Sequence, residues 1–256
     1  RIVRAANGEL LVTAAGGSVS GGDIRSPWRS SDNGQTWTGD ERLTDRLLYG
    51  CLRAAPEGRI ELYEISESPP FKIRRAESKD HGKTWSEERV VGEVSFPPEM
   101  PFAYTSMGVA GLLDTKDGAL LLFVRARMDN WKYKYKGRWY YSTLGPSANY
   151  CLRSTDGGET WSEPVNMDGP PHDDNFPQFL KEVVEICAAE TLDGKVLAMI
   201  RPDWSPTIWE AWSHDGGKTW SGVKLNNLAS GNSEIYVARI PSTGDLLCIW
   251  NQAGTE

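Results

Sequence analysis

Two charged side chains, Glu185 and Arg201, stand at the ends of neighbouring apolar runs in the sequence. Glu185 opens the first run, Gly194 lies in the turn that follows, and Arg201 closes the second run. If the two runs pair as antiparallel strands, both side chains emerge close together at the edge opposite the turn. A guanidinium binds a carboxylate through two parallel N–H bonds, so the pair could hold an acidic ligand, or it could form only an ion pair. Arg125 has the same place in the preceding segment and is a candidate substitute anion ligand.

Aromatic and cationic residues gather in a second place, the segment 126–147. Its members are Trp131, Tyr133, Tyr135, Trp139, Tyr140 and Tyr141, with Lys132, Lys134, Lys136 and Arg138 among them. Aromatic rings beside cations suit sugar stacking and anion contact. A surface loop that closes over its neighbour, or a subunit contact, explains the same composition. We expect 126–147 and 164–182 to be long loops on the face of the molecule that carries function.

A turn motif recurs along the chain and indicates the elements that position these residues. The pattern Ser-x-Asp-x-Gly-x-Thr-Trp occurs at 30–37, 78–85, 154–161 and 213–220. Its Asp can accept backbone N–H bonds, its Gly supplies a positive φ, and its Trp can pack the turn onto a strand. The motif is therefore structural.

Each copy of the motif follows three short apolar runs, so the repeating unit is one four-stranded sheet. The Gly turn between strands one and two then lies on the same rim as the motif, which joins strands three and four. The loops of variable length fall on the other rim, with Glu185 and Arg201. Nothing in the sequence resembles a long amphipathic helix, so we expect an all-β propeller.

Composition excludes several classes of protein. The chain has 256 residues, 39% of them hydrophobic, and a net charge of −7, which disfavours a nucleic-acid or anionic-membrane surface. No apolar stretch approaches the roughly 20 residues of a membrane span. The four cysteines lie alone in apolar runs and are interpreted as core residues rather than metal ligands or disulfides. We expect no cofactor.

The repeated turn is that of the Asp-box, or BNR repeat, and the arrangement resembles the six-bladed propeller of the sialidase (neuraminidase) superfamily across essentially the whole chain. Approximate blades are 1–44, 45–93, 94–166, 167–226 and a partial blade 227–256. About four and a half blades are then present. We interpret the chain as a fragment truncated at both ends, or else as an open propeller whose exposed edge could pair with another copy.

This resemblance implies roles for individual residues. Sialidases carry in their fourth blade a Glu, a Gly turn and an Arg at the spacing of Glu185, Gly194 and Arg201. There the Glu activates a tyrosine nucleophile, and the Arg is one of three that bind the substrate carboxylate. The family's general acid/base is an Asp of the first-blade loop, for which Asp23 is the candidate because it is the one carboxylate there, although it could simply cap its loop. Asp173 and Asp174 are alternatives.

The resemblance implies a retaining exo-glycosidase that removes a terminal sialic acid or related acidic sugar from a glycan. A non-catalytic propeller that binds glycan or protein, and a glycosidase acting on another sugar, stay open, because the Asp-box defines a fold rather than a reaction. The family's tyrosine and its other two arginines are expected outside these residues, so we expect negligible hydrolysis of an aryl sialoside by the 256 residues alone. A secreted or periplasmic location fits the family.

Overall fold

The computed structural model describes residues 2–12, 28–39, 50–66, 68–96, 106–135, 138–168, 183–202, 206–231 and 233–252. In these ranges the chain is built from β-strands, with one short 3-10 helix, Pro56–Gly58 (η1). No helix in the described ranges is long and apolar enough to cross a membrane. The all-β prediction is confirmed. The chain divides into a first unit, residues 1–66 and 70–93, and a second unit, residues 67–69 and 94–256.

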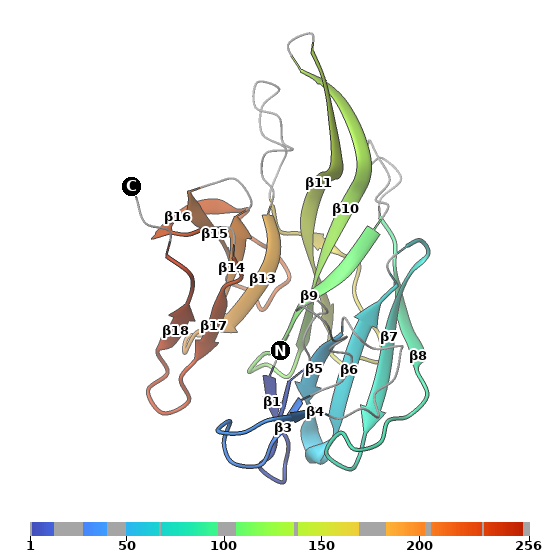
Figure 1. Ribbon diagram of the computed structural model, residues 1–256, viewed down its shortest axis with the longest axis vertical. Helices are drawn as coiled ribbons and strands as arrows, with labels where there is room; N and C mark the ends of the chain where they lie inside the picture. The colour runs from blue at the N-terminus through green and yellow to red at the C-terminus, as the bar shows by residue number, and fades with distance from the viewer. Residues whose placement is uncertain are drawn as a thin grey trace. The chain divides into compact units, whose positions relative to one another are not determined.

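The first unit holds two four-stranded sheets whose strands neighbour one another in chain order (Figure 1). The first sheet consists of β1 (Ile2–Arg4), β2 (Leu10–Val12), β3 (Trp28–Ser30) and β4 (Thr38–Gly39). The second sheet consists of β5 (Cys51–Ala54), β6 (Ile60–Ile65), β7 (Phe71–Ser78) and β8 (Arg89–Val94). Leu11, Ile60 and Leu62 are fully buried and form a core to which both sheets contribute.

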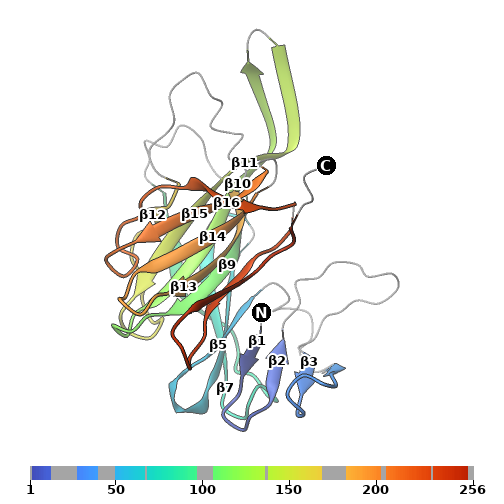
Figure 2. The same cartoon turned by 90° about the vertical axis from the view of Figure 1, so that its left-hand side faces the viewer.

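The second unit holds two further four-stranded sheets and a two-stranded one (Figure 2). The third sheet consists of β9 (Ser106–Asp114), β10 (Leu120–Tyr135), β11 (Arg138–Ser154) and β12 (Val165–Asn166). The fourth consists of β13 (Val183–Glu190), β14 (Val196–Pro202), β15 (Thr207–Ser213) and β16 (Lys224–Ala229), and the fifth of β17 (Tyr236–Arg239) and β18 (Leu246–Ile249). Strand β13 contacts both β9 and β17. The first strands of successive sheets therefore lie side by side, as the inner strands of propeller blades do. The predicted count of six blades and the predicted blade limits stay predictions.

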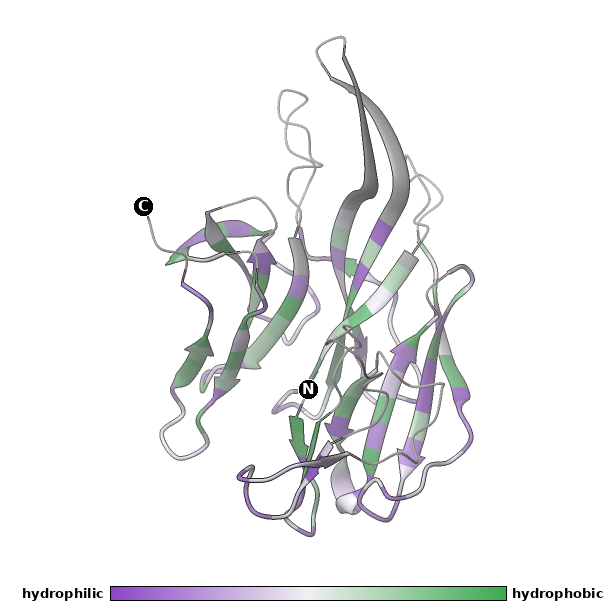
Figure 3. Ribbon diagram, in the orientation of Figure 1, coloured by the Kyte–Doolittle hydropathy of each residue, from purple (hydrophilic) through white to green (hydrophobic). Residues whose placement is uncertain are grey.

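Two apolar layers hold the second unit together, and β14 contributes to both. Its side chains alternate in direction, so Ala198 and Ile200 pack into one cluster with the third sheet. Leu197 and Met199 pack into another with Val237 of the fifth sheet. Figure 3 shows hydrophobic residues, in green, along the strands of this unit, with hydrophilic ones among them. Burial of this strand on both faces explains why its sequence is a continuous apolar run.

The Asp-box turns have the predicted hydrogen bonds. In the third copy, Asp156 Oδ1 accepts the backbone N–H groups of Glu159 and Thr160, both at 3.0 Å. Its Oδ2 accepts the Thr160 hydroxyl at 2.5 Å, and Ser154 Oγ accepts the Gly158 N–H at 2.8 Å. Each copy follows the third strand of its sheet. The structural interpretation of the motif is confirmed.

The prediction that 126–147 is a loop is wrong. Strands β10 and β11 run through it as one long antiparallel hairpin, paired from Leu120 with Ser154 out to Tyr135 with Arg138 (Figure 1). A register shift between Arg127 and Asp129 interrupts the pairing. The physical reason is the alternation of aromatic residues with lysines, which is a strand pattern of period two in residue types that favour strands. The segment 164–182 contains β12, and its residues 169–182 lie outside the described part of the chain.

Candidate functional site

The β13–β14 hairpin positions Glu185 and Arg201. Its turn is held by the Thr191 hydroxyl, which accepts the Lys195 N–H at 3.1 Å, and by Gly194, whose φ of +84° most residues avoid. Both strands are mostly buried beyond the turn. The polar side chains Glu185 and Arg201 therefore lie at the end of the hairpin opposite this turn.

A β-bulge places the two side chains together. Val183 pairs with Pro202 and Ile186 pairs with Ile200, so residues 184 and 185 of β13 both stand opposite Arg201. Such a bulge redirects a side chain at the end of a strand and is frequent beside active sites. Arg201 Nη1 donates to Glu185 Oε2 at 2.6 Å. The exposed fractions of the two side chains are 21% for Arg201 and 39% for Glu185, so solvent reaches both.

Arg125 holds the corresponding position in the third sheet. It follows the Gly118 turn by as many residues as Arg201 follows the Gly194 turn, and it pairs with Gly108 of β9. Its side chain is half-buried. Arg125 lies within β10, which continues to Tyr135, whereas Arg201 lies one residue before the end of β14. The first strands of the two sheets, β9 and β13, lie side by side.

The functional roles predicted for Glu185, Arg201 and Arg125 stay predictions. Asp23, the predicted general acid/base, lies outside the described residues, and so do its alternatives Asp173 and Asp174. The structure thus brings Glu185 and Arg201 into contact and places Arg125 on the adjacent sheet.

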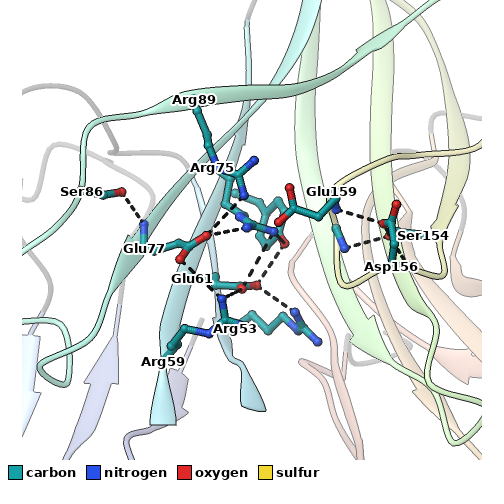
Figure 4. Close-up of polar contacts among 12 residues, drawn as sticks. Arg53, Arg59, Glu61, Arg75, Glu77, Ser86, Arg89, Ser154, Asp156 and Glu159 are labelled. Carbon is teal, nitrogen blue, oxygen red and sulfur yellow. Dashed lines mark hydrogen bonds and ion pairs between the residues drawn. The ribbon is translucent and has the colours of Figure 1, made fainter. Parts of the chain in front are cut away.

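A buried charged cluster in the second sheet is a feature that the sequence analysis missed (Figure 4). Glu61 is completely buried, and its Oε2 accepts bonds from Arg53 Nη1 at 2.8 Å and from the Tyr63 hydroxyl at 3.0 Å. Arg75, which is 2% exposed, bonds to Tyr63 and to Glu77. Buried charges require such pairing, because an isolated ion inside a protein is very costly.

The electrostatics of this cluster follow from burial and from the guanidinium groups. Burial, and after it the negative charge of Glu61, raises the pKa of Tyr63 to about 12. Burial works against ionisation of Glu77, but the bond from Arg75 brings the pKa of Glu77 below its usual value. Tyr63 is therefore a neutral hydrogen-bond donor, and its hydroxyl donates to Glu61.

One signal in the sequence could have revealed the cluster. Glu61 and Tyr63 on β6, and Arg75 and Glu77 on β7, sit two positions apart, so each pair lies on one face of its strand. Charged residues that alternate with apolar ones normally indicate a solvent-facing side. Here that side is covered, which the alternation alone cannot reveal.

The described residues contain no group of three or more His, Cys, Asp or Glu side chains placed to hold a metal ion. The two carboxylates of the buried cluster are bonded to arginines, which suits a fixed ion-pair network rather than cation binding. Among the described residues, the groups in contact at the open end of the β13–β14 hairpin are one carboxylate and one guanidinium.

Comparison with known proteins identifies the fold. The sequence matches the BNR repeat-like domain over residues 8–256. No protein of curated function matches it.

Several solved structures are similar to the chain. A protein of unknown function from Dyadobacter fermentans has a TM-score of 0.63 at 20% identity, over 96% of this chain and 72% of that one. The α-L-arabinanase of Penicillium chrysogenum, complexed with arabinobiose, has a TM-score of 0.63 at 19% identity, over 100% and 74%. A Hadza microbial sialidase has a TM-score of 0.63 at 16% identity, over 94% of this chain and 49% of the sialidase. At these identities the likeness concerns the fold, and the predicted sialidase-type β-propeller is confirmed.

Proposed function

Because the chain belongs to the family of BNR repeat-like domains, we propose that the protein is an exo-glycosidase of the sialidase type. It removes a terminal sialic acid or a related acidic sugar from a glycan, with retention of configuration. The observation that carries this proposal is the contact between Arg201 and Glu185 at the open end of the β13–β14 hairpin. The likeness of the fold to a microbial sialidase supports it.

In this proposal Arg201 binds the carboxylate of the sugar. A guanidinium offers a planar pair of donors that match the two oxygens of a carboxylate. One of its donors, Nη1, bonds to Glu185 Oε2 at 2.6 Å. The incoming carboxylate takes the place of Glu185, and Arg125 on the adjacent sheet adds a second positive charge. The exchange matters because it releases Glu185 at the moment when substrate arrives.

The released Glu185 acts as a general base. It accepts the phenolic proton of a tyrosine whose oxygen attacks the anomeric carbon, while Asp23 donates a proton to the departing glycosidic oxygen. Water then attacks the glycosyl-tyrosine, Asp23 takes up its proton, and the sugar is released with two inversions at the anomeric carbon. A neutral tyrosine suits an acidic sugar, because a carboxylate nucleophile would be repelled by the substrate's own carboxylate.

The experiment that tests the proposal measures hydrolysis of 4-methylumbelliferyl α-sialoside by the protein expressed at its natural length. We expect Arg201→Ala to raise KM and lower kcat/KM. Removing one partner of a charge pair that the bound substrate shields from water costs about 2 to 5 kcal/mol. At 1.36 kcal/mol for each factor of ten, this is about 30-fold to several thousandfold. Glu185→Gln should lower kcat by about 10²- to 10⁴-fold, the usual contribution of a general base.

Lys195→Ala is the matched control. Lys195 pairs with Asp193 at 2.6 Å, in the turn at the other end of the same hairpin, with both side chains well exposed. It should leave kcat and KM unchanged. Activity in Arg201→Ala equal to that of the control would contradict the proposed carboxylate site.

A glycosidase that acts on a neutral sugar is the second candidate, because an α-L-arabinanase has the same TM-score over the whole chain. The same protein is therefore assayed with 4-nitrophenyl α-L-arabinofuranoside. Turnover of the arabinoside but not of the sialoside, with Arg201→Ala fully active, would favour this candidate.

A further inference from the structure

Three sulfur atoms from three strands gather in the apolar layer between the fourth and fifth sheets. They belong to Cys187 on β13, Met199 on β14 and Cys248 on β18, all of which pack in the same cluster. Cys187 and Met199 are almost fully buried, and Cys248 is half-buried. None of the three takes part in the proposed glycosidase chemistry.

The backbone register brings the three side chains together. Cys187 pairs directly with Met199 across β13 and β14, and side chains of such a pair have Cβ atoms about 5 Å apart on one face of the sheet. Cys248 Sγ lies 3.6 Å from Met199 Sδ. Cys187 Sγ lies 3.3 Å from both the backbone N and O of Val237, the residue that pairs with Cys248.

We propose that Cys187, Met199 and Cys248 form a binding site for a soft monovalent metal ion such as Cu(I). Thiolate and thioether sulfurs are the ligands that Cu(I) selects. Zn²⁺ is a poorer fit, because its structural sites take four ligands and the cluster offers three sulfurs. The hard cations Ca²⁺ and Mg²⁺ require oxygen ligands, which these side chains lack.

The charge balance of the site also favours a monovalent ion. Binding breaks the S–H bond of Cys248, forms a sulfur–metal bond, and releases one proton to solvent, with no change in oxidation state. One thiolate and one Cu(I) leave the site neutral, which an apolar cluster tolerates far better than a net charge. Met199 adds a neutral thioether. Cys187 keeps its S–H bond, which donates to the Val237 carbonyl oxygen at 3.3 Å, and lines the site as a neutral thiol. The ion enters at Cys248, which solvent reaches.

In the test, the coloured complex of Cu(I) with bicinchoninate is titrated with the reduced 256-residue chain under anaerobic conditions. We expect the protein to withdraw one equivalent of Cu(I). Cys248→Ser should weaken the affinity by more than about 100-fold, and Met199→Leu, which keeps the volume of the side chain, by about tenfold. Cys51→Ser is the matched control, because Cys51 is a buried cysteine of the first unit. It should bind as the wild type does.

Each other result overturns the proposal. No withdrawal of Cu(I) by the wild-type chain would show that the sulfurs serve packing alone. Equal losses in Cys51→Ser and Cys248→Ser would show unspecific thiol binding. Because Met199→Leu retains the apolar cluster, an unchanged far-UV circular dichroism spectrum together with unchanged affinity would remove the thioether from the site.

Discussion

Replacing Glu61 by Gln tests whether the buried charged cluster of the second sheet depends on charge or only on shape. The change keeps the size of the side chain and an acceptor oxygen but removes the negative charge. Glu61 has no exposed surface, and the guanidinium of Arg53 that it binds at 2.8 Å is 8% exposed. The variant therefore takes a carboxylate away from a positive charge that water cannot reach freely.

The expected loss of unfolding free energy follows from this burial. Breaking a buried ion pair by removing one partner costs about 3 to 5 kcal/mol. We expect about 3 kcal/mol, because the amide oxygen of Gln still accepts a bond and Arg75 keeps its contact with Glu77. For a urea dependence of about 3 kcal/mol per molar, the unfolding midpoint should fall by about 1 M.

The assay is urea unfolding followed by far-UV circular dichroism, with hydrogen exchange of β5, β6 and β7 to locate the loss in the first unit. Lys195→Ala is the control, because it breaks an ion pair that is exposed, with a cost of about 0 to 1 kcal/mol. A loss in Glu61→Gln no larger than that of the control would refute the reasoning. It would mean that water or a rearranged arginine compensates for the missing charge.

Three further predictions concern the turns and the thiols. The Asp-box carboxylates have lowered pKa values, about 2 in the first copy. The stability that they contribute is therefore complete above the unfolded pKa of about 4 and is lost as the pH falls through the folded pKa values. Acid unfolding followed by circular dichroism should begin below about pH 4, and Asp156→Asn should weaken this pH dependence. Gly217→Ala should lower the midpoint of thermal unfolding more than Gly118→Ala, although both glycines have a positive φ. A Cβ added at Gly217 would lie 2.7 Å from a leucine side-chain carbon, whereas a Cβ added at Gly118 would meet nothing within 4 Å. Equal midpoints in the two variants would contradict the packing argument. Cys248 should react with a disulfide reagent in the native protein, whereas Cys151 should not. Burial encloses the sulfur of Cys151 and raises its pKa to about 12. Mass mapping of the labelled peptides measures this, and labelling of Cys151 before Cys248 would contradict the prediction.

The sequence alone was sufficient for features whose contacts are local. The bonds of the Asp-box join residues within four positions of one another, as Asp156 and Thr160 show, so the motif contains its own folding information. Short apolar runs separated by Gly turns were sufficient to predict the four-stranded repeat. They also predicted that Glu185 and Arg201 emerge close together. The alternation of aromatic residues and lysines in 126–147 also carried strand information, which the loop interpretation overlooked.

Only the tertiary structure decided which distant side chains meet. The extra residue in β13 that sets Glu185 opposite Arg201 is a property of pairing register, which composition does not encode. The charged cluster needs Arg53, Glu61 and Arg75 on three strands, all facing a covered side of the sheet. The sulfur cluster joins a strand of the fifth sheet to two strands of the fourth. In each case the contact depends on how sheets pair and stack, because a side chain's neighbours across strands are fixed by backbone hydrogen bonds rather than by its neighbours along the chain.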